Sequence, residues 1–99
     1  MAGIELWLKV RGFQQEIKFH PERKWRFDWA HSEFKIAIEV EGGVWSGGRH
    51  TSGSGFIKDM EKYNAATVLG WKLLRYTPKQ FQDGLQIGDI ECLLNLKKN

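Results

Sequence analysis

The sequence predicts a mixed α/β (α+β) domain in which a four-stranded mixed sheet is flanked by helices. Two neighbouring stretches, Trp25–Trp29 and Phe34–Gly43, alternate between apolar and polar residues as β-strands do. A helix-spaced stretch, Phe56–Leu69, separates them from a further apolar run, and a helix in that place allows a parallel crossover. The 99 residues, of which 41% are hydrophobic, suit one domain spanning 1–99.

Two elements are predicted ahead of this pair of strands. Helical spacing of apolar residues predicts a short helix over Gly3–Val10, which Gly12 ends as a C-terminal cap. Alternation then predicts a strand over Gln15–His20, which Pro21 breaks. Three consecutive strands with short turns indicate an antiparallel meander.

The elements after the meander follow from the same patterns. Phe56–Leu69 is expected to form a largely buried helix capped by Gly70, and Trp71–Tyr76 forms the fourth strand. A short turn or helical piece over Lys79–Gln82 comes next. A closing amphipathic helix over Leu85–Leu96 completes the predicted chain.

Composition limits the classes of function. The net charge of +3 and a pI near 9.1 suit a polyanionic partner without identifying one. The single cysteine, Cys92, excludes an internal disulfide and a multi-cysteine zinc site, and its apolar surroundings predict a buried thiol. Neither a signal peptide nor a membrane-length apolar run is visible, so no membrane partner and a cytoplasmic location are expected.

Three carboxylates are expected to meet on one face of the central strand pair. If the turn Ala30–Glu33 joins the strands, Asp28 can lie beside Glu39 and Glu41. The opposite face of the first strand is then expected to carry Trp25, Phe27 and Trp29. Like charges in register destabilise strand pairing, and a bound divalent cation is the usual remedy. The pattern therefore predicts a Mg²⁺ site, with Mn²⁺ as an alternative ion.

Basic and aromatic residues surround this acidic centre. The residues expected to contact DNA are Arg23, Lys24, Arg26, Trp45 and Arg49. Cationic side chains around a metal site would suit a phosphodiester substrate, although ordinary solvated Lys and Arg are the alternative. Trp45 lies in the glycine-rich stretch 42–55, a predicted loop, where it either stacks against bases or anchors the loop.

These residues resemble a known family. The αβββαβ order, with an aspartate ending one strand and an acidic pair on the next, resembles the PD-(D/E)xK nuclease superfamily, so the resemblance implies a restriction-endonuclease-like core. Asp28 matches its aspartate and Glu39 its second acid. The runs FHPERKWRFDWA, IAIEVEGGVWSGGRHTSGSGF, D-x-x-K-Y-N and GWKLLRYT together resemble small phage and prophage endonuclease-like proteins, which are similar to very-short-patch-repair and homing endonucleases. The resemblance covers about Phe19–Thr77.

The chain departs from the family pattern at one important position. The family has a lysine where this chain has Glu41. His50 and Asp59 are substitutes that the repair-type relatives imply. Lys62 is another, although an ion pair with Asp59 one helical turn away is the alternative for it. The proline that precedes the family's aspartate is also replaced, by Phe27.

The resemblance implies a Mg²⁺-dependent endodeoxyribonuclease. Asp28, Glu39 and Glu41 would hold the metal, His50 would act as general base or acid, and Arg49 and Lys62 would stabilise developing charge. One small domain offers little surface for a duplex, so a homodimer is considered. Glu5 is either an accessory acid of the site or an ordinary surface acid. His20 and His31 are expected to lie at the surface.

Two other classes of function stay open. A catalytically silent DNA-binding module of the same fold would bind DNA without cutting it. A metal-binding or structural phage protein would carry the same acids as ordinary surface charges. Substitution of the three acids separates these possibilities.

Overall fold

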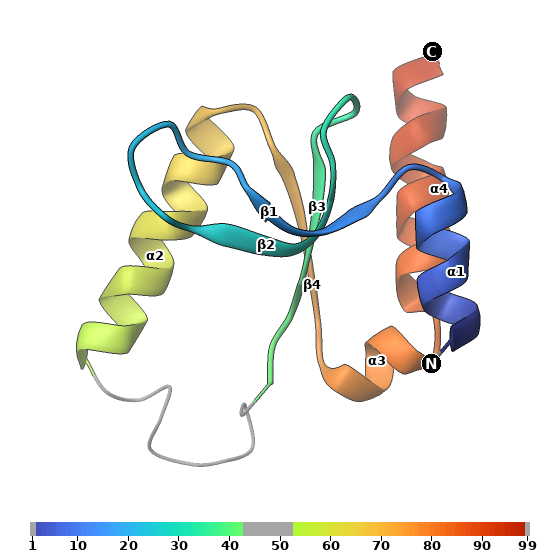
Figure 1. Ribbon diagram of the computed structural model, residues 1–99, viewed down its shortest axis with the longest axis horizontal. Coiled ribbons are helices and arrows are strands. Elements are labelled where there is room, and N and C mark those ends of the chain that lie inside the picture. The colour runs from blue at the N-terminus through green and yellow to red at the C-terminus, as the bar shows by residue number, and fades with distance from the viewer. Residues whose placement is uncertain (1, 43–52, 99) are drawn as a thin grey trace.

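The computed structural model describes residues 2–42 and 53–98, and its elements follow the predicted order (Figure 1). They are α1 (Ala2–Val10), β1 (Gln14–Lys18), β2 (Arg26–His31), β3 (Ile36–Val40), α2 (Gly53–Val68), β4 (Lys72–Tyr76), α3 (Pro78–Gln82) and α4 (Leu85–Lys98). Boundaries differ by a few residues. β2 continues through His31, so the turn follows it instead of beginning at Ala30, and β1 ends before the predicted limit at His20.

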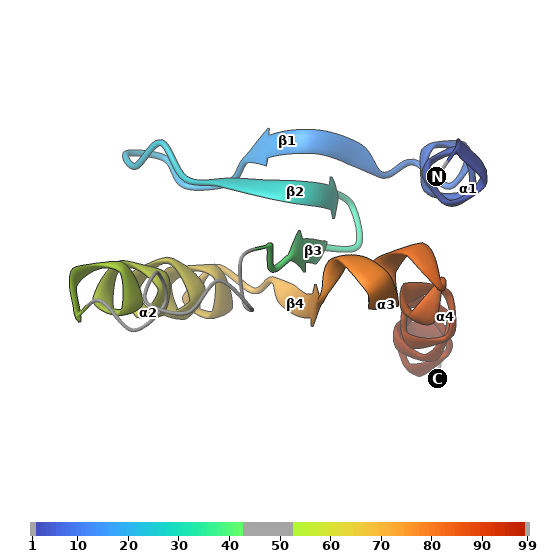
Figure 2. The same cartoon turned by 90° about the horizontal axis from the view of Figure 1, so that it is seen from below.

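The four strands form one mixed sheet in the order β1-β2-β3-β4. β1, β2 and β3 pair antiparallel, and β3 pairs parallel with β4 across the α2 connection. The predicted meander, parallel crossover and mixed α+β class are therefore confirmed. The sheet is strongly twisted, so β1 and β2 lie in a different layer from β3 and β4 when viewed from below (Figure 2).

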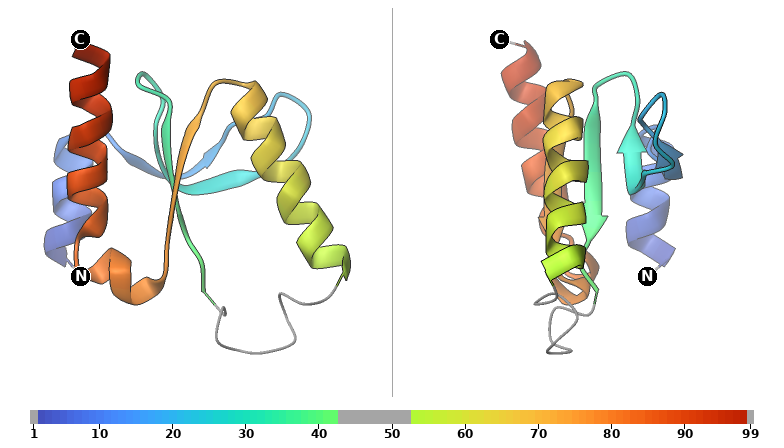
Figure 3. Two further views of the ribbon diagram at one scale, coloured as in Figure 1. Left: turned by 180° about the vertical axis from the view of Figure 1, so that it is seen from behind. Right: turned by 90° about the vertical axis from the view of Figure 1, so that its left-hand side faces the viewer.

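Two hydrophobic clusters lie on opposite faces of the sheet. The first cluster contains Leu8 of α1, Ile90 of α4 and alternate residues of the strands, including Ile36 and Ile38. The second cluster contains Ala37, together with Phe27, Ala30 and Ala66 of α2. Figure 3 shows the corresponding arrangement, with α1 and α4 at one end of the molecule and α2 at the other. Each face of β3 is therefore committed to a different set of helices.

The faces of β2 differ from the prediction. The two rings were expected on one face of β2. Trp29 instead packs in the first cluster and Phe27 in the second, on opposite faces of the sheet. At this level the sheet is irregular: Glu16, which the β1–β2 register places opposite Asp28, has a left-handed φ of 55°. The ribbon changes the direction of its side chains between Phe27 and Trp29.

Helix α2 is much less buried than expected. Its N-terminal half exposes Phe56, Ile57 and Met60, by 54%, 56% and 48% respectively, and Ala66 is its one buried residue among those described. The helix inclines away from β3 and β4 toward its N-terminus (Figure 1). Its helical spacing was correctly recognised, but a large part of its apolar surface has no contact with the core.

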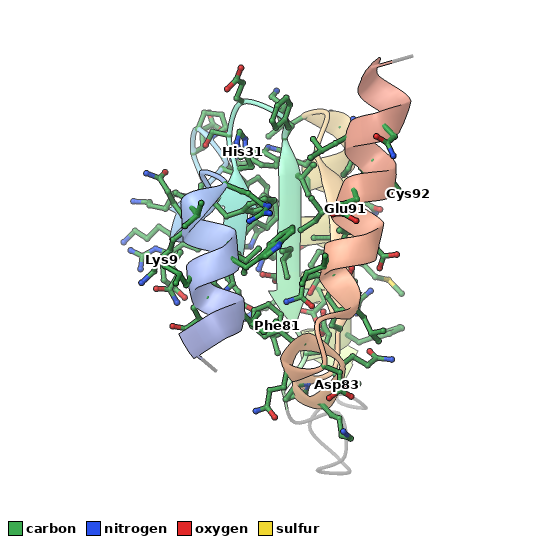
Figure 4. All side chains as sticks on the ribbon, turned by 90° about the vertical axis from the view of Figure 1, so that its right-hand side faces the viewer. Lys9, His31, Phe81, Asp83, Glu91 and Cys92 are labelled. Carbon is green, nitrogen blue, oxygen red and sulfur yellow. The ribbon has the colours of Figure 1, made fainter. Side chains whose placement is uncertain are left out.

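Two further burial predictions are wrong. Cys92 is exposed, because the core-facing side of α4 is formed by Ile90, Leu93 and Leu94, and Cys92 points away from it (Figure 4). His31 is buried, not on the surface: its ring lies 4.5 Å from that of Phe34, whose N–H donates to His31 Nδ1. None of the helices within 2–42 and 53–98 has the length and apolarity needed to cross a membrane.

Gly12 and Gly70 end α1 and α2 with the same capping motif, as predicted. Gly12, at φ 92°, donates to the Lys9 carbonyl at 3.1 Å, and the next N–H reaches back five residues. Gly70, at φ 90°, donates to the Thr67 carbonyl at 3.0 Å, again followed by a five-residue bond. Left-handed backbone at both positions favours glycine over any other residue.

The two glycines provide a matched test of packing. Alanine at either position carries the left-handed penalty of about 1–2 kcal/mol. At Gly12 the added methyl would also lie 3.0 Å from the buried His31 ring, whereas at Gly70 it would meet only the flexible Lys35 chain at 3.7 Å. We expect Gly12→Ala to lower the free energy of unfolding by about 1 kcal/mol more than Gly70→Ala in urea titrations. Equal losses would contradict this packing.

Candidate active site

Asp28 and Glu39 lie side by side where β2 and β3 separate. The ladder between these strands ends with the pair Trp29–Ile38, and the same register places Asp28 opposite Glu39. The Asp28 N–H donates to Glu39 Oε2 at 2.9 Å, and the Val40 N–H donates to Asp28 Oδ2 at 2.7 Å. Each carboxylate thus accepts a peptide N–H of the facing strand. We call these two residues the acid pair.

Lys62 of α2 completes this arrangement. Its ammonium donates to Glu39 Oε1 at 2.6 Å, and the two side chains are only 17% and 9% exposed. Both oxygens of Glu39 therefore have a positive or N–H partner. An ion pair between Lys62 and Asp59, the alternative considered from the sequence, is not found among the described residues.

The electrostatics of Glu39 reflect a balance between burial and pairing. Burial raises the pKa of the Glu39 carboxyl above its ordinary value, because the charged form loses water. The hydrogen bonds from Lys62 and from the Asp28 N–H oppose this rise in pKa. Lys62 thus provides the largest of the effects that oppose the rise in the Glu39 pKa.

Glu41 has partners of its own on the same face. Arg75 of β4 donates through Nε to Glu41 Oε2 at 2.8 Å, and the Tyr63 hydroxyl lies 3.1 Å from the same oxygen. The hydroxyl also lies 3.5 Å from Glu39 Oε1, so Tyr63 stands between the two glutamates. Burial and both carboxylates raise the pKa of Tyr63 well above 10, which keeps its proton in place. The hydrogen bond that Arg75 donates to Glu41 likewise raises the pKa of Arg75.

The donor atoms suit a small, hard cation only in part. Within 2–42 and 53–98, no three His, Cys, Asp or Glu side chains form a group that could hold a metal ion, and Glu41 is paired with Arg75 and Tyr63. Its role as a metal ligand stays a prediction. Two neighbouring carboxylates still fit Mg²⁺, which is usually held by one or two carboxylates together with water and substrate phosphates. Asp28 Oδ1 accepts no hydrogen bond from the described residues and is open to such an ion.

This chain matches no family model, no curated protein and no solved structure. No related protein therefore indicates the chemistry of the site, and the support for it comes from the geometry of the site's own residues.

The other predicted residues lie at different distances from the acid pair. Asp59 lies on α2 close enough to Arg75 to raise the pKa of that side chain further. Glu5 lies on α1, at the opposite end of the molecule from α2, and is not brought to the acid pair (Figure 1). The exposed residues of the β1–β2 connection and the start of β2 include Arg23, Lys24 and Arg26. The residues that lie outside the described part of the chain are Trp45, Arg49 and His50.

Two residues of the site were not identified from the sequence. Tyr63 directly follows Lys62, and its place in the D-x-x-K-Y-N run is the one signal that points to it. Arg75 carries no such signal. It lies near Glu41 because the parallel register pairs Glu39 with Arg75, and that register is a tertiary property.

Replacing Lys62 tests the balance around Glu39. Lys62→Met removes the cation, so the pKa of Glu39 should rise further, and we expect a loss of about 1–3 kcal/mol in unfolding free energy at pH 7. A carboxyl with a raised folded pKa stabilises the fold below its unfolded pKa near 4.5 and loses that contribution as pH rises through the folded value. The difference in unfolding free energy between the wild type and Lys62→Met should therefore shrink as the pH falls toward 4.5.

Arg75→Met is the matched control, because it removes a cation that is 51% exposed from Glu41. Solvent screening limits its expected cost to about 0.5 kcal/mol. Urea titrations from pH 4.5 to 8, with an NMR titration of the Glu39 carboxyl, compare the two variants. A Glu39 pKa that does not change in Lys62→Met would show that the ion pair contributes nothing.

Proposed function

We propose that this chain is a metal-dependent DNA endonuclease that hydrolyses phosphodiester bonds. The observation that carries this proposal is the acid pair with the Lys62 ammonium held on Glu39. Two adjacent carboxylates beside one lysine are the group of side chains that the PD-(D/E)xK resemblance requires. We further propose that the protein is phage- or prophage-encoded and acts in the host cytoplasm.

The position of Lys62 supports the proposal despite the missing motif lysine. Glu41 occupies the family's lysine position, two residues after Glu39 on β3. Lys62 approaches Glu39 from α2 instead, so its charge lies beside the same carboxylate although it belongs to a different element. A cation there can stabilise the negative charge that develops on a phosphate in the transition state.

Asp28 and Glu39 are the residues that would hold Mg²⁺. When bound, the ion would polarise the scissile phosphate and lower the pKa of a water molecule. The chain's own groups hold the acids in place: the peptide N–H groups of Asp28 and Val40 orient them, and the Tyr63 hydroxyl separates Glu39 from Glu41.

Glu41 and Arg75 have a supporting role in this proposal. Their ion pair occupies one oxygen of Glu41 and holds the Arg75 guanidinium at the edge of the site, 4.6 Å from the Tyr63 ring centroid. Arg75 and the exposed Arg23, Lys24 and Arg26 would contact phosphates. His50 remains the proposed general base or acid.

A cleavage assay tests the proposal. We expect cutting of supercoiled plasmid or branched DNA in Mg²⁺ or Mn²⁺, and none in EDTA. Asp28→Asn and Glu39→Gln should abolish it, because each removes a charged metal ligand while keeping the shape of the side chain. Lys62→Met should lower the rate by at least roughly 100-fold through lost charge stabilisation.

Glu33→Gln is the matched control, since Glu33 is an exposed acid in the β2–β3 turn and should leave cleavage unchanged. Circular dichroism of each variant separates loss of activity from loss of fold. Tight DNA binding without cleavage on any substrate, unaffected by metal, would instead favour the catalytically silent DNA-binding module.

A further inference from the structure

A column of aromatic rings extends from the second cluster to the surface at the β1–β2 connection. Phe27 is fully buried, and the Phe19 ring stacks on it at 4.0 Å between centroids with planes 6° apart. Trp25 continues the column, with its ring 6.1 Å from that of Phe19 and tilted by only 16°. The column therefore ends in a half-buried indole that stacks on Phe19 and meets the His20 ring edge-to-face at 5.2 Å.

A cation and a basic surface surround the outer end of this column. The Arg23 guanidinium lies 4.7 Å from the Trp25 ring centroid, and Arg23 is otherwise exposed. The connection is held in shape by His20, whose Nδ1 accepts the N–H groups of Glu22 and Arg23 at 3.1 and 3.0 Å. Over 18–26 the chain has four Lys or Arg side chains against one Glu, so this surface attracts a polyanion.

The contact between Arg23 and Trp25 is one that a nucleobase can replace. A solvent-exposed cation–π contact is weaker than the stacking of a base on an aromatic side chain. A base that takes the place of the guanidinium would also free Arg23 to bind the adjoining phosphate. One contact is thus exchanged for two, a stacked base on Trp25 and a phosphate on Arg23.

The column connects this surface to the acid pair. Lys62 Nζ lies 5.9 Å from the Phe27 ring centroid, and Asp28 directly follows Phe27. Together with the ring spacings of 4.0 and 6.1 Å, this places Trp25 within about five nucleotides of Lys62, at ~3.4 Å per stacked nucleotide. This straight-line separation is short enough for one strand of DNA to span.

We infer that Trp25 binds an unpaired base, so that the substrate is DNA with a single-stranded segment close to the cleaved phosphate. This inference rests on the proposed nuclease function for its choice of DNA. Bases within an intact duplex are stacked on both faces and cannot cover Trp25 without being unstacked. Single-stranded, flapped or branched DNA presents such a base, and continuous duplex does not.

Binding in EDTA tests the inference without any cleavage step. Fluorescence anisotropy would compare a labelled 12-nucleotide thymidine oligomer with a 12-base-pair duplex. Trp25→Leu should weaken binding of the single strand by roughly 10-fold and change duplex binding by less than about twofold. Trp25→Phe keeps an aromatic face and should restore most of the affinity for the single strand.

The chain offers a matched pair of arginine variants. Arg23→Ala removes a proposed phosphate contact and should weaken both DNA forms. Arg11→Ala removes an equivalent cation from above another indole, Trp7 on α1, at 3.8 Å, and should change neither. Equal weakening of the single strand and the duplex by Trp25→Leu, or no weakening of either, would overturn the inference, as would tighter Trp25-dependent binding of the matching uridine oligomer.

The outcome is separable from that of the cleavage assay. A protein that binds the single strand through Trp25 and never cuts DNA would remove the nuclease function and keep the base-binding site. A protein that cuts duplex plasmid in Mg²⁺ and is unaffected by Trp25→Leu would keep the nuclease and remove the base-binding site.

Discussion

The burial of Glu39 is the constraint on which the rest of the site depends. A carboxylate on a side chain that is 9% exposed in the middle of a sheet is stable only if its oxygens have donors or a counter-charge. The Asp28 N–H supplies one donor, which requires β2 and β3 to separate at that residue instead of continuing their ladder. Lys62 supplies the charge, which determines the turn of α2 that must face the sheet.

The need for a counter-charge also applies to the crowded carboxylates of the site as a group. Three carboxylates in one part of the sequence indicated that a metal ion must neutralise them. The structure provides a protein cation for each glutamate, Lys62 for Glu39 and Arg75 for Glu41, with Tyr63 between them. Repulsion among the glutamates alone therefore no longer requires a metal. The case for Mg²⁺ depends instead on the acid pair and its open oxygen at Asp28.

The sequence predicted those parts of the fold that depend on local patterns. Alternation in β3 correctly divided Ile36 and Ile38 from Glu39 and Glu41, and two glycines correctly marked helix ends. The faces of β2 were missed because strict alternation does not hold between Phe27 and Trp29, and no periodicity reveals such an irregularity. Burial of α2 was overestimated because an apolar stripe does not show whether a partner lies against it. The partner of Lys62 depends on how α2 docks, and that is a tertiary property.

The separation of the site's members along the chain has a consequence for folding. Asp28 and Glu39 are 11 residues apart and meet within one hairpin, whereas Lys62 comes 23 residues after Glu39. Short loops close faster than long ones, so the hairpin can form while its carboxylate still faces water. Glu39 cannot be dehydrated cheaply until the lysine arrives. We therefore expect docking of α2 and loss of water from the sheet to be coupled, so that the site forms late in the folding of the domain.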